Sequence, residues 1–129
     1  MKGDGPPDES QKERMMNGSE KQVQWAEDIK TEVAMKVAAY RDYYQNRFEQ
    51  KGVAADDPRW ETITEANSTL DYLNRHDEAK WWIENLKGFG KTIELPGVPV
   101  NLRDEGMRIV EKCKALAYDE ARRERMAAR

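Results

Sequence analysis

Apolar residues in the first half of the chain recur at steps of three or four positions, which is the period of an α-helix. The stripe consists of Ala26, Ile29, Val33, Val37, Tyr40, Tyr44 and Phe48, and Val23, Trp25 and Tyr43 widen it. Ser19 and Gln22 have the spacing of a capping box at its start. Gly52 follows as a C-terminal stop. We therefore predict one helix from Ser19 to about Lys51, roughly 45–50 Å long.

Three shorter helical patterns follow. Asp57-Pro58 is typical of a helix start, and Asp77 has the position of an N-cap for a short third helix. The last helix begins at Asn101 or Asp104. The expected inward-facing residues are Trp60, Ile63, Asn67, Leu70 and Leu73 or Asn74 in the second helix, Ala79, Trp82, Ile83 and Leu86 in the third, and Met107, Val110, Cys113, Leu116 or Ala117, and Ala121 in the last.

Residues 87–100 contain glycines and prolines that exclude a regular helix. Within them, Thr92 to Leu95 has the composition of a short strand or an extended arm. The predicted fold class is therefore all-α: a small bundle of about four helices, with one long N-terminal helix and a Gly/Pro-rich loop before the last helix.

The chain has 129 residues, which suits a single domain, and we place that domain at 18–129. Residues 1–17 are rich in glycine, proline and polar side chains, which favours a flexible tail. The net charge is −3, and Cys113 is the only cysteine. No apolar run reaches the roughly 20 residues that span a bilayer. We expect a cytoplasmic protein with no membrane partner.

Two segments resemble motifs of a protein family. The first is Gly18-Ser19-x-Lys21-Gln22-x-x-Trp25-Ala26-x-x-Ile29, and the second is Ala79-Lys80-Trp81-Trp82-Ile83-Glu84-Asn85. The chain resembles an uncharacterised helical domain family of bacteriophages and bacterial mobile elements. The resemblance implies a compact helical unit that works in the host cytoplasm, and it implies no reaction. Independently of the resemblance, Trp25, Ile29, Trp82 and Ile83 are large apolar side chains of the kind that pack two helices against each other.

The sequence predicts no catalytic residue, metal site or cofactor. Gly88-Phe89-Gly90-Lys91-Thr92 resembles the end of a phosphate-binding loop, but it follows a helix, and Asn85 occupies the position of the first glycine. His76 is the only histidine, and it reads as a cap or a solvated turn residue, although Asp71 or Asp77 lies near enough in sequence to pair with it. Cys113 reads as a small buried hydrophobe. The acids at 56–57 and 104–105 lie at helix starts, where the dipole favours them.

We therefore expect a non-enzymatic module that binds a host or phage protein, for example as an inhibitor of a host defence protein. The tyrosines at 40, 43 and 44 occupy more than one side of their helix, and the adjacent Trp81 and Trp82 cannot both point inward. Some of these rings should therefore be exposed, and exposed Trp and Tyr are typical interface anchors. Residues 53–76 carry five acids against two bases. The predicted partner-binding residues are Tyr43, Glu61, Glu65, Asp71 and Trp81.

The alternative is a nucleic-acid-binding accessory protein that uses the basic C-terminal helix. Its predicted phosphate contacts are Lys87, Lys91, Arg122, Arg123 and Arg125. Residues 101–129 carry eight bases against six acids, a composition that favours a solvated, mixed-charge helix face over a phosphate-binding one. Pairing of this segment with the acidic residues 53–76 would give either internal docking or a homodimer.

Overall fold

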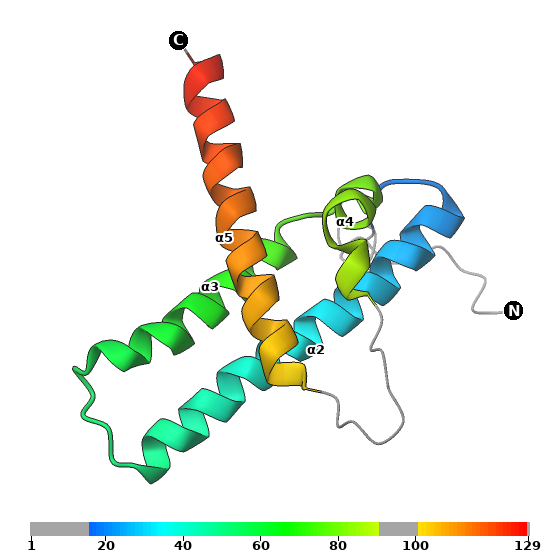
Figure 1. The fold of residues 1–129 in the computed structure, drawn as a ribbon. Coiled ribbons are helices and arrows are strands. Elements are labelled where there is room, and N and C mark those ends of the chain that lie inside the picture. The colour runs from blue at the N-terminus through cyan, green and yellow to red at the C-terminus, as the bar shows by residue number, and fades with distance from the viewer. Residues whose placement is uncertain (1–15, 91–100, 129) are drawn as a thin grey trace, which may run out of the picture.

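The computed structural model describes residues 16–90 and 101–128, which form an all-α bundle of four helices, as predicted. The elements are α2 (Glu20–Gln50), η2 (Pro58–Trp60), α3 (Glu61–Asn74), α4 (Ala79–Leu86), η3 (Lys87–Phe89) and α5 (Leu102–Ala127). Helix α2 contacts each of the other three helices. α3 folds back beside it, α4 packs on its N-terminal half, and α5 crosses the α2–α3 pair (Figure 1). The C-terminal end of α5 extends beyond the other helices.

Helix α2 begins and ends where the sequence predicts. Ser19 accepts a hydrogen bond from the Gln22 amide, and the Gln22 side chain accepts one from the Ser19 amide. At the other end Lys51 is the C-cap, and Gly52 has a φ of 66°, a left-handed conformation that only glycine adopts without strain. The helix turns into α3 through η2, where Asp57 caps the Arg59 amide.

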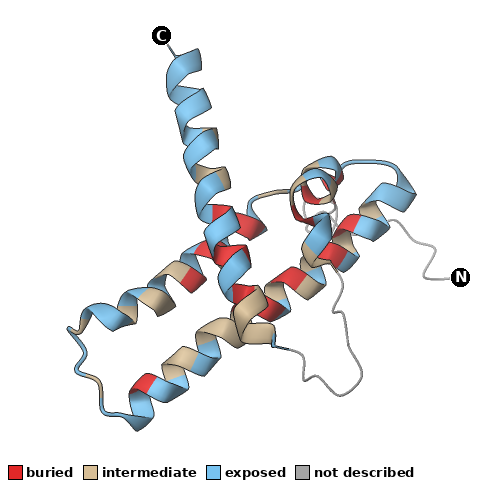
Figure 2. Ribbon diagram, viewed as in Figure 1, coloured by how far each residue is buried: buried red, intermediate tan, exposed pale blue. Residues whose placement is uncertain are grey.

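The core lies where α2, α4 and α5 cross, with the C-terminal half of α3 closing one side (Figure 2). Trp82 is fully buried there, and its indole Nε1 donates to the His76 carbonyl at 3.0 Å. Gly106 makes the close crossing of α5 over α2 possible, because a Cβ at this position would lie only 2.6 Å from the Tyr40 Cβ. The largest fully buried side chains are Trp82, Lys36, Ile29, Leu86, Ile109, Val33, Val37 and Val110.

Lys36 is the exception among these core residues, because it carries a charge. Its Nζ donates to the Phe89 carbonyl oxygen at 2.8 Å and pairs with Glu105 at 3.2 Å. The side chain therefore ties α2 to the turn after α4 and to the first turn of α5.

Two residues before the predicted domain start also contact the bundle. Met16 is buried, and the Asn17 backbone pairs with the segment before α4: the Asn17 amide donates to the Asp77 carbonyl, and the Ala79 amide donates to the Asn17 carbonyl. Residues 1–15 lie outside the described residues. The same pairing corrects the start of α4, because Glu78 is its N-cap and no side chain caps it. Asp77 contributes its backbone carbonyl instead.

Several residues predicted to face inward lie at the surface. Trp25 keeps 48% of its area exposed, and Met107 keeps 45%. Tyr43, at the edge of the apolar stripe and one of the predicted partner-binding residues, keeps 39%. The predicted inner positions Asn67 and Ala121 are exposed as well. The α3 residues that are buried are Ala66, Thr69, Tyr72 and Leu73, so the buried stripe is rotated from the predicted one. The predicted strand at Thr92 to Leu95 lies outside the described residues.

Candidate interaction surfaces

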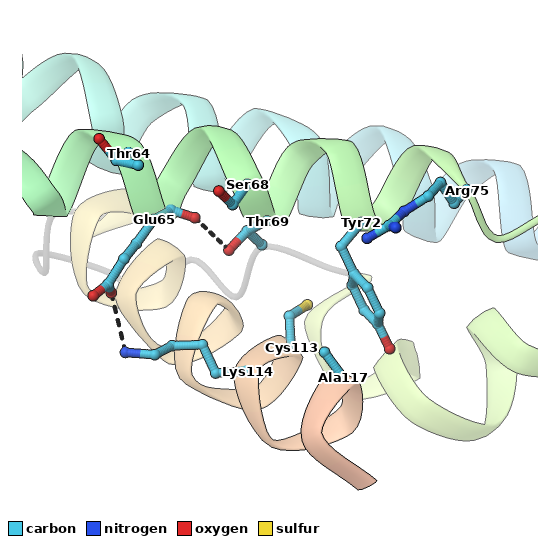
Figure 3. A pocket seen from close by; sticks show the side chains of 9 residues that line it. All are labelled: Thr64, Glu65, Ser68, Thr69, Tyr72, Arg75, Cys113, Lys114 and Ala117. Atoms are coloured by element: carbon cyan, nitrogen blue, oxygen red, sulfur yellow. Dashed lines mark hydrogen bonds and ion pairs between the residues drawn. The ribbon is translucent and has the colours of Figure 1, made fainter. Parts of the chain in front are cut away.

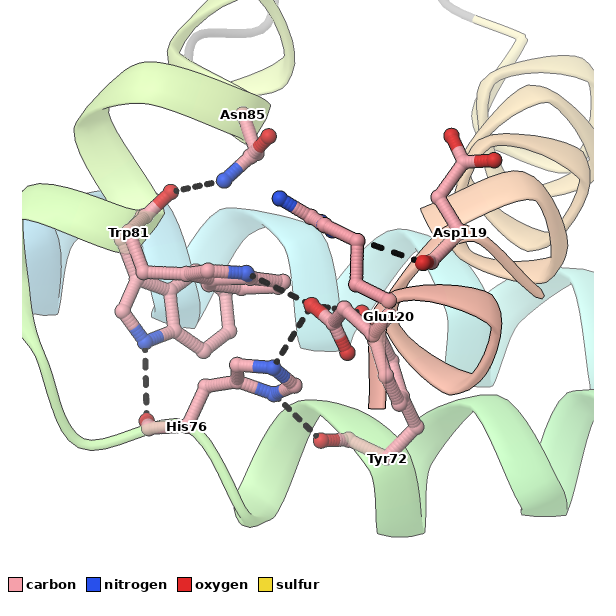
Figure 4. Close-up of polar contacts among 8 residues, drawn as sticks. Tyr72, His76, Trp81, Asn85, Asp119 and Glu120 are labelled. Carbon is pink, nitrogen blue, oxygen red and sulfur yellow. Dashed lines mark hydrogen bonds and ion pairs between the residues drawn. The ribbon is translucent and has the colours of Figure 1, made fainter. Parts of the chain in front are cut away.

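One carboxylate links α3, α4 and α5. Oε1 of Glu120, on α5, accepts hydrogen bonds from the Tyr72 hydroxyl at 2.9 Å and the Trp81 indole at 3.2 Å, and it lies 3.3 Å from His76 Nε2 (Figure 4). His76 Nδ1 lies 2.9 Å from the Tyr72 carbonyl oxygen. The His76 and Trp81 rings stack with their centroids 3.7 Å apart. We call these four residues the Glu120 cluster.

The electrostatics of this cluster favour a charged Glu120. Burial raises the pKa of the carboxyl group, but the hydrogen bonds from Tyr72 and Trp81, together with His76, outweigh burial and hold the pKa below its usual value. Burial and the bond to Glu120 also raise the pKa of the Tyr72 hydroxyl, which stays protonated. A charged Glu120 that accepts hydrogen bonds from Tyr72 and Trp81 is well suited to hold α5 against α3 and α4.

The cluster changes the interpretation of two residues. Trp81 is only partly exposed, and both its ring face and its indole nitrogen have partners within the fold. It is therefore not the exposed anchor that the sequence suggested. Of the two roles predicted for His76, the structure shows the cap, because its Nδ1 lies beside the Tyr72 carbonyl at the end of α3. Its second partner is Glu120 rather than Asp71 or Asp77. Glu120 is separated from them by some 40 residues, so no local spacing indicated this contact.

A shallow groove runs between α3 and α5 beside the cluster. One hollow, of about 250 Å³, is lined by Thr64, Glu65, Ser68, Thr69, Tyr72, Arg75, Cys113, Lys114 and Ala117 (Figure 3). A second hollow, of about 300 Å³, adjoins it along α5 and shares Tyr72, Arg75 and Ala117. Cys113 is 2% exposed, and burial raises the pKa of its thiol to about 12, so this cysteine is a buried apolar group, as expected.

The predicted partner-binding residues fall in different settings. Glu61 and Asp71 are exposed and lie about 80° apart around α3. Glu65 is turned toward α5 and pairs with Lys114 at 3.0 Å, so its charge is balanced within the fold. Tyr43 is exposed on α2, where the Arg103 guanidinium lies over its ring at 4.6 Å.

Arg103 lies over the Tyr43 ring, and the exposed Met107 follows Arg103 one turn later on α5. Both lie in the first two turns of α5, four positions apart and therefore on one side of the helix. Arg103 was not among the predicted site residues, and Met107 was predicted to face the core. The approach of Arg103 to Tyr43 depends on the crossing of α5 over α2, which no local pattern encodes. We call Tyr43, Arg103 and Met107 the crossing patch.

The residues predicted to contact nucleic acid also lie in different parts of the structure. Arg122, Arg123 and Arg125 are exposed on the end of α5 that extends beyond the bundle. Lys87 is exposed in the turn after α4, and Lys91 lies outside the described residues. The described part of the glycine-rich segment, up to Gly90, is a 3-10 turn that follows a helix.

The described residues also bear on other classes of function. They contain no group of three or more His, Cys, Asp or Glu side chains arranged to hold a metal ion. No helix among residues 16–90 and 101–128 is long and apolar enough to cross a membrane. Comparison with protein-family models, curated proteins and solved structures finds no match to this chain.

Proposed function

We propose that this chain is a non-enzymatic protein-binding module, encoded by a phage or another mobile element, that binds a host protein through the crossing patch. The observation that carries the proposal is the exposed Tyr43 ring with the Arg103 guanidinium fixed over it. Tyrosine and arginine are enriched among the residues that dominate binding energies. Met107, one turn along α5 from Arg103, adds an exposed apolar side chain.

The patch is held rigid by the packing beneath it. Gly106, next to Met107, lies against Tyr40 and the Lys36 backbone, so α5 cannot rotate without disturbing the core. A preorganised surface loses little side-chain entropy on binding. The exposed acids Glu61 and Asp71 on α3 supply negative charge for contact with basic groups of a partner. Within this proposal the module inhibits a host defence protein by covering its surface, with steric and electrostatic blockade and no chemistry.

The test is affinity capture from a bacterial host lysate, followed by quantitative binding of the captured protein to variants. We expect Tyr43→Ala to weaken binding by about 2 kcal/mol, a change of roughly 30-fold. Trp25→Ala is the matched control, because Trp25 is also an exposed ring on the same side of α2, about 27 Å away. Binding that falls equally in both variants, or a wild-type chain that retains no protein, would contradict the proposal.

A further inference from the structure

The C-terminal part of α5 is a second surface, of different chemistry. We call the segment from Tyr118 to Ala128 the arm. Cys113 is the last buried residue of α5, and residues 121–128 are all exposed (Figure 2). The arm nevertheless remains helical to Ala127. It is therefore a helix with solvent on most of its circumference.

The charges of the arm are segregated around the helix. Tyr118, Arg122 and Arg125 follow a spacing of four and three, which puts them within about 60° of one another. We call these three residues the arginine face. Tyr118 is 63% exposed, and within the described part of the chain neither arginine forms an ion pair.

The acids of the arm lie elsewhere. Glu120 points back into its cluster, and Glu124 lines the groove next to Arg75. Asp119 lies on the flank nearest Arg123, whose Nε donates to the Asp119 carbonyl at 3.4 Å. The arginine face consequently presents two guanidinium groups and a phenol ring without a carboxylate between them.

We propose that the arginine face binds the phosphate backbone of duplex DNA, with the arm lying in or along the major groove. An α-helix with its side chains is about 10–12 Å across, and the major groove of B-DNA is about 12 Å wide. The major groove of A-form RNA is too narrow for a helix, and single strands call for several stacking rings, whereas this face has one.

An apolar protein groove fits this face less well. Helix-in-groove recognition needs apolar anchors at positions i, i+3 or i+4, and i+7. Here those positions are Tyr118, Ala121 or Arg122, and Arg125. Arginine forks match phosphate oxygens, and they form two parallel hydrogen bonds to them. The two guanidinium groups of the arginine face therefore favour a polyanionic partner over an apolar one.

The net charge of −3 does not prevent this contact. Arg125 lies twelve residues beyond Cys113, which is about 18 Å along the helix axis. The Debye length is about 10 Å at 0.1 M salt, so the acids of the bundle are largely screened at the arm. Two phosphate contacts give weak binding with a definite salt dependence.

The experiment is fluorescence anisotropy of a labelled duplex of about 20 base pairs, titrated with the full chain at salt concentrations from about 50 to 200 mM. We expect log K to fall with log salt at a slope of about −1.8, a loss of roughly 12-fold over that range. Arg122→Ala and Arg125→Ala should each reduce the slope by about 1. Alanine keeps the helix, which far-UV circular dichroism of each variant checks.

Arg123→Ala is the matched control, because it removes the same charge from another side of the arm and should leave the slope unchanged. The proposal is overturned if wild-type protein binds no duplex at the lowest salt, or if Arg123→Ala weakens binding as much as Arg122→Ala does. It is equally overturned if single-stranded RNA or a polyglutamate of equal charge binds more tightly than the duplex. None of these readouts depends on a protein partner, so the result is independent of the function proposed above.

Discussion

Replacing Gly106 with alanine should separate the two helices that build the crossing patch. A Cβ at this position would lie 2.6 Å from the Tyr40 Cβ, and it would be closer still to the Lys36 carbonyl oxygen. Carbon atoms in contact normally lie about 3.5–4 Å apart, so α5 must move away from α2 by about 1 Å. The carbonyl belongs to the α2 backbone, which cannot turn aside as a side chain can.

Two effects of opposite sign set the size of the change. Overpacking in a tight core costs about 1–3 kcal/mol, and a backbone clash belongs at the upper end of that range. Alanine recovers about 1 kcal/mol, because glycine is the poorer helix former. The expected net loss is about 2 kcal/mol in the free energy of unfolding, which corresponds to a melting temperature lower by roughly 5–10 °C.

Urea denaturation followed by circular dichroism measures this loss. Gly88→Ala is the control, because no atom lies within 4 Å of the Cβ that it would add. That variant should be neutral or slightly stabilised. If Gly106→Ala is as stable as the wild type, helix propensity alone decides at this site, and the close crossing of α2 and α5 does not exist as described.

Three further predictions concern side chains inside the fold. Glu120→Gln should destabilise the protein at neutral pH. Because the folded state lowers the pKa of Glu120, the stability that the carboxylate contributes should disappear as the pH falls below about 4.3. Urea titrations of the wild type and the variant across this pH range would show the loss. Lys36→Met leaves Glu105 and the Phe89 carbonyl without this donor, and it should cost about 1–3 kcal/mol of unfolding free energy in the same assay. Cys113, with its pKa raised to about 12 by burial, should react with a thiol reagent at pH 8 only in denaturant, and rapid labelling of the native protein would contradict its burial.

The elements of the fold were largely predictable, because local chemistry determines them. The stripe from Ala26 to Phe48, the capping box at Ser19 and the stop at Gly52 place α2 within one residue of its observed ends. The start of α4 was not predictable in this way. Its first amides are satisfied by the Asn17 backbone, which is distant in sequence, rather than by the nearby Asp77 side chain.

Periodicity alone could not identify which aromatic residues stay outside. Trp81 and Trp82 are adjacent. Trp82 is buried, and Trp81 is only partly exposed because a carboxylate from α5 accepts a hydrogen bond from its indole. Tyr43 remains exposed at the point where α5 crosses α2, and the Arg103 guanidinium of α5 lies over its ring. In each case the deciding partner comes from a crossing helix, and the positions along α5 that meet α2, α3 and α4 depend on where Gly106 allows the closest approach.

The direction of the arm follows from the same geometry. Beyond Ala121 the helix packs on nothing in the described chain, and a free helix of only a few turns is marginal in water. Its helicity must therefore propagate from the packed half of α5. Among the described residues, Glu120 is the last of α5 that bonds to α3 and α4, so the Glu120 cluster is the final tie between the bundle and the arm. The carboxylate of Glu120 lies only two residues before Arg122. Its bonds hold one side of α5 toward the core, and the arginine face on another side is left toward solvent.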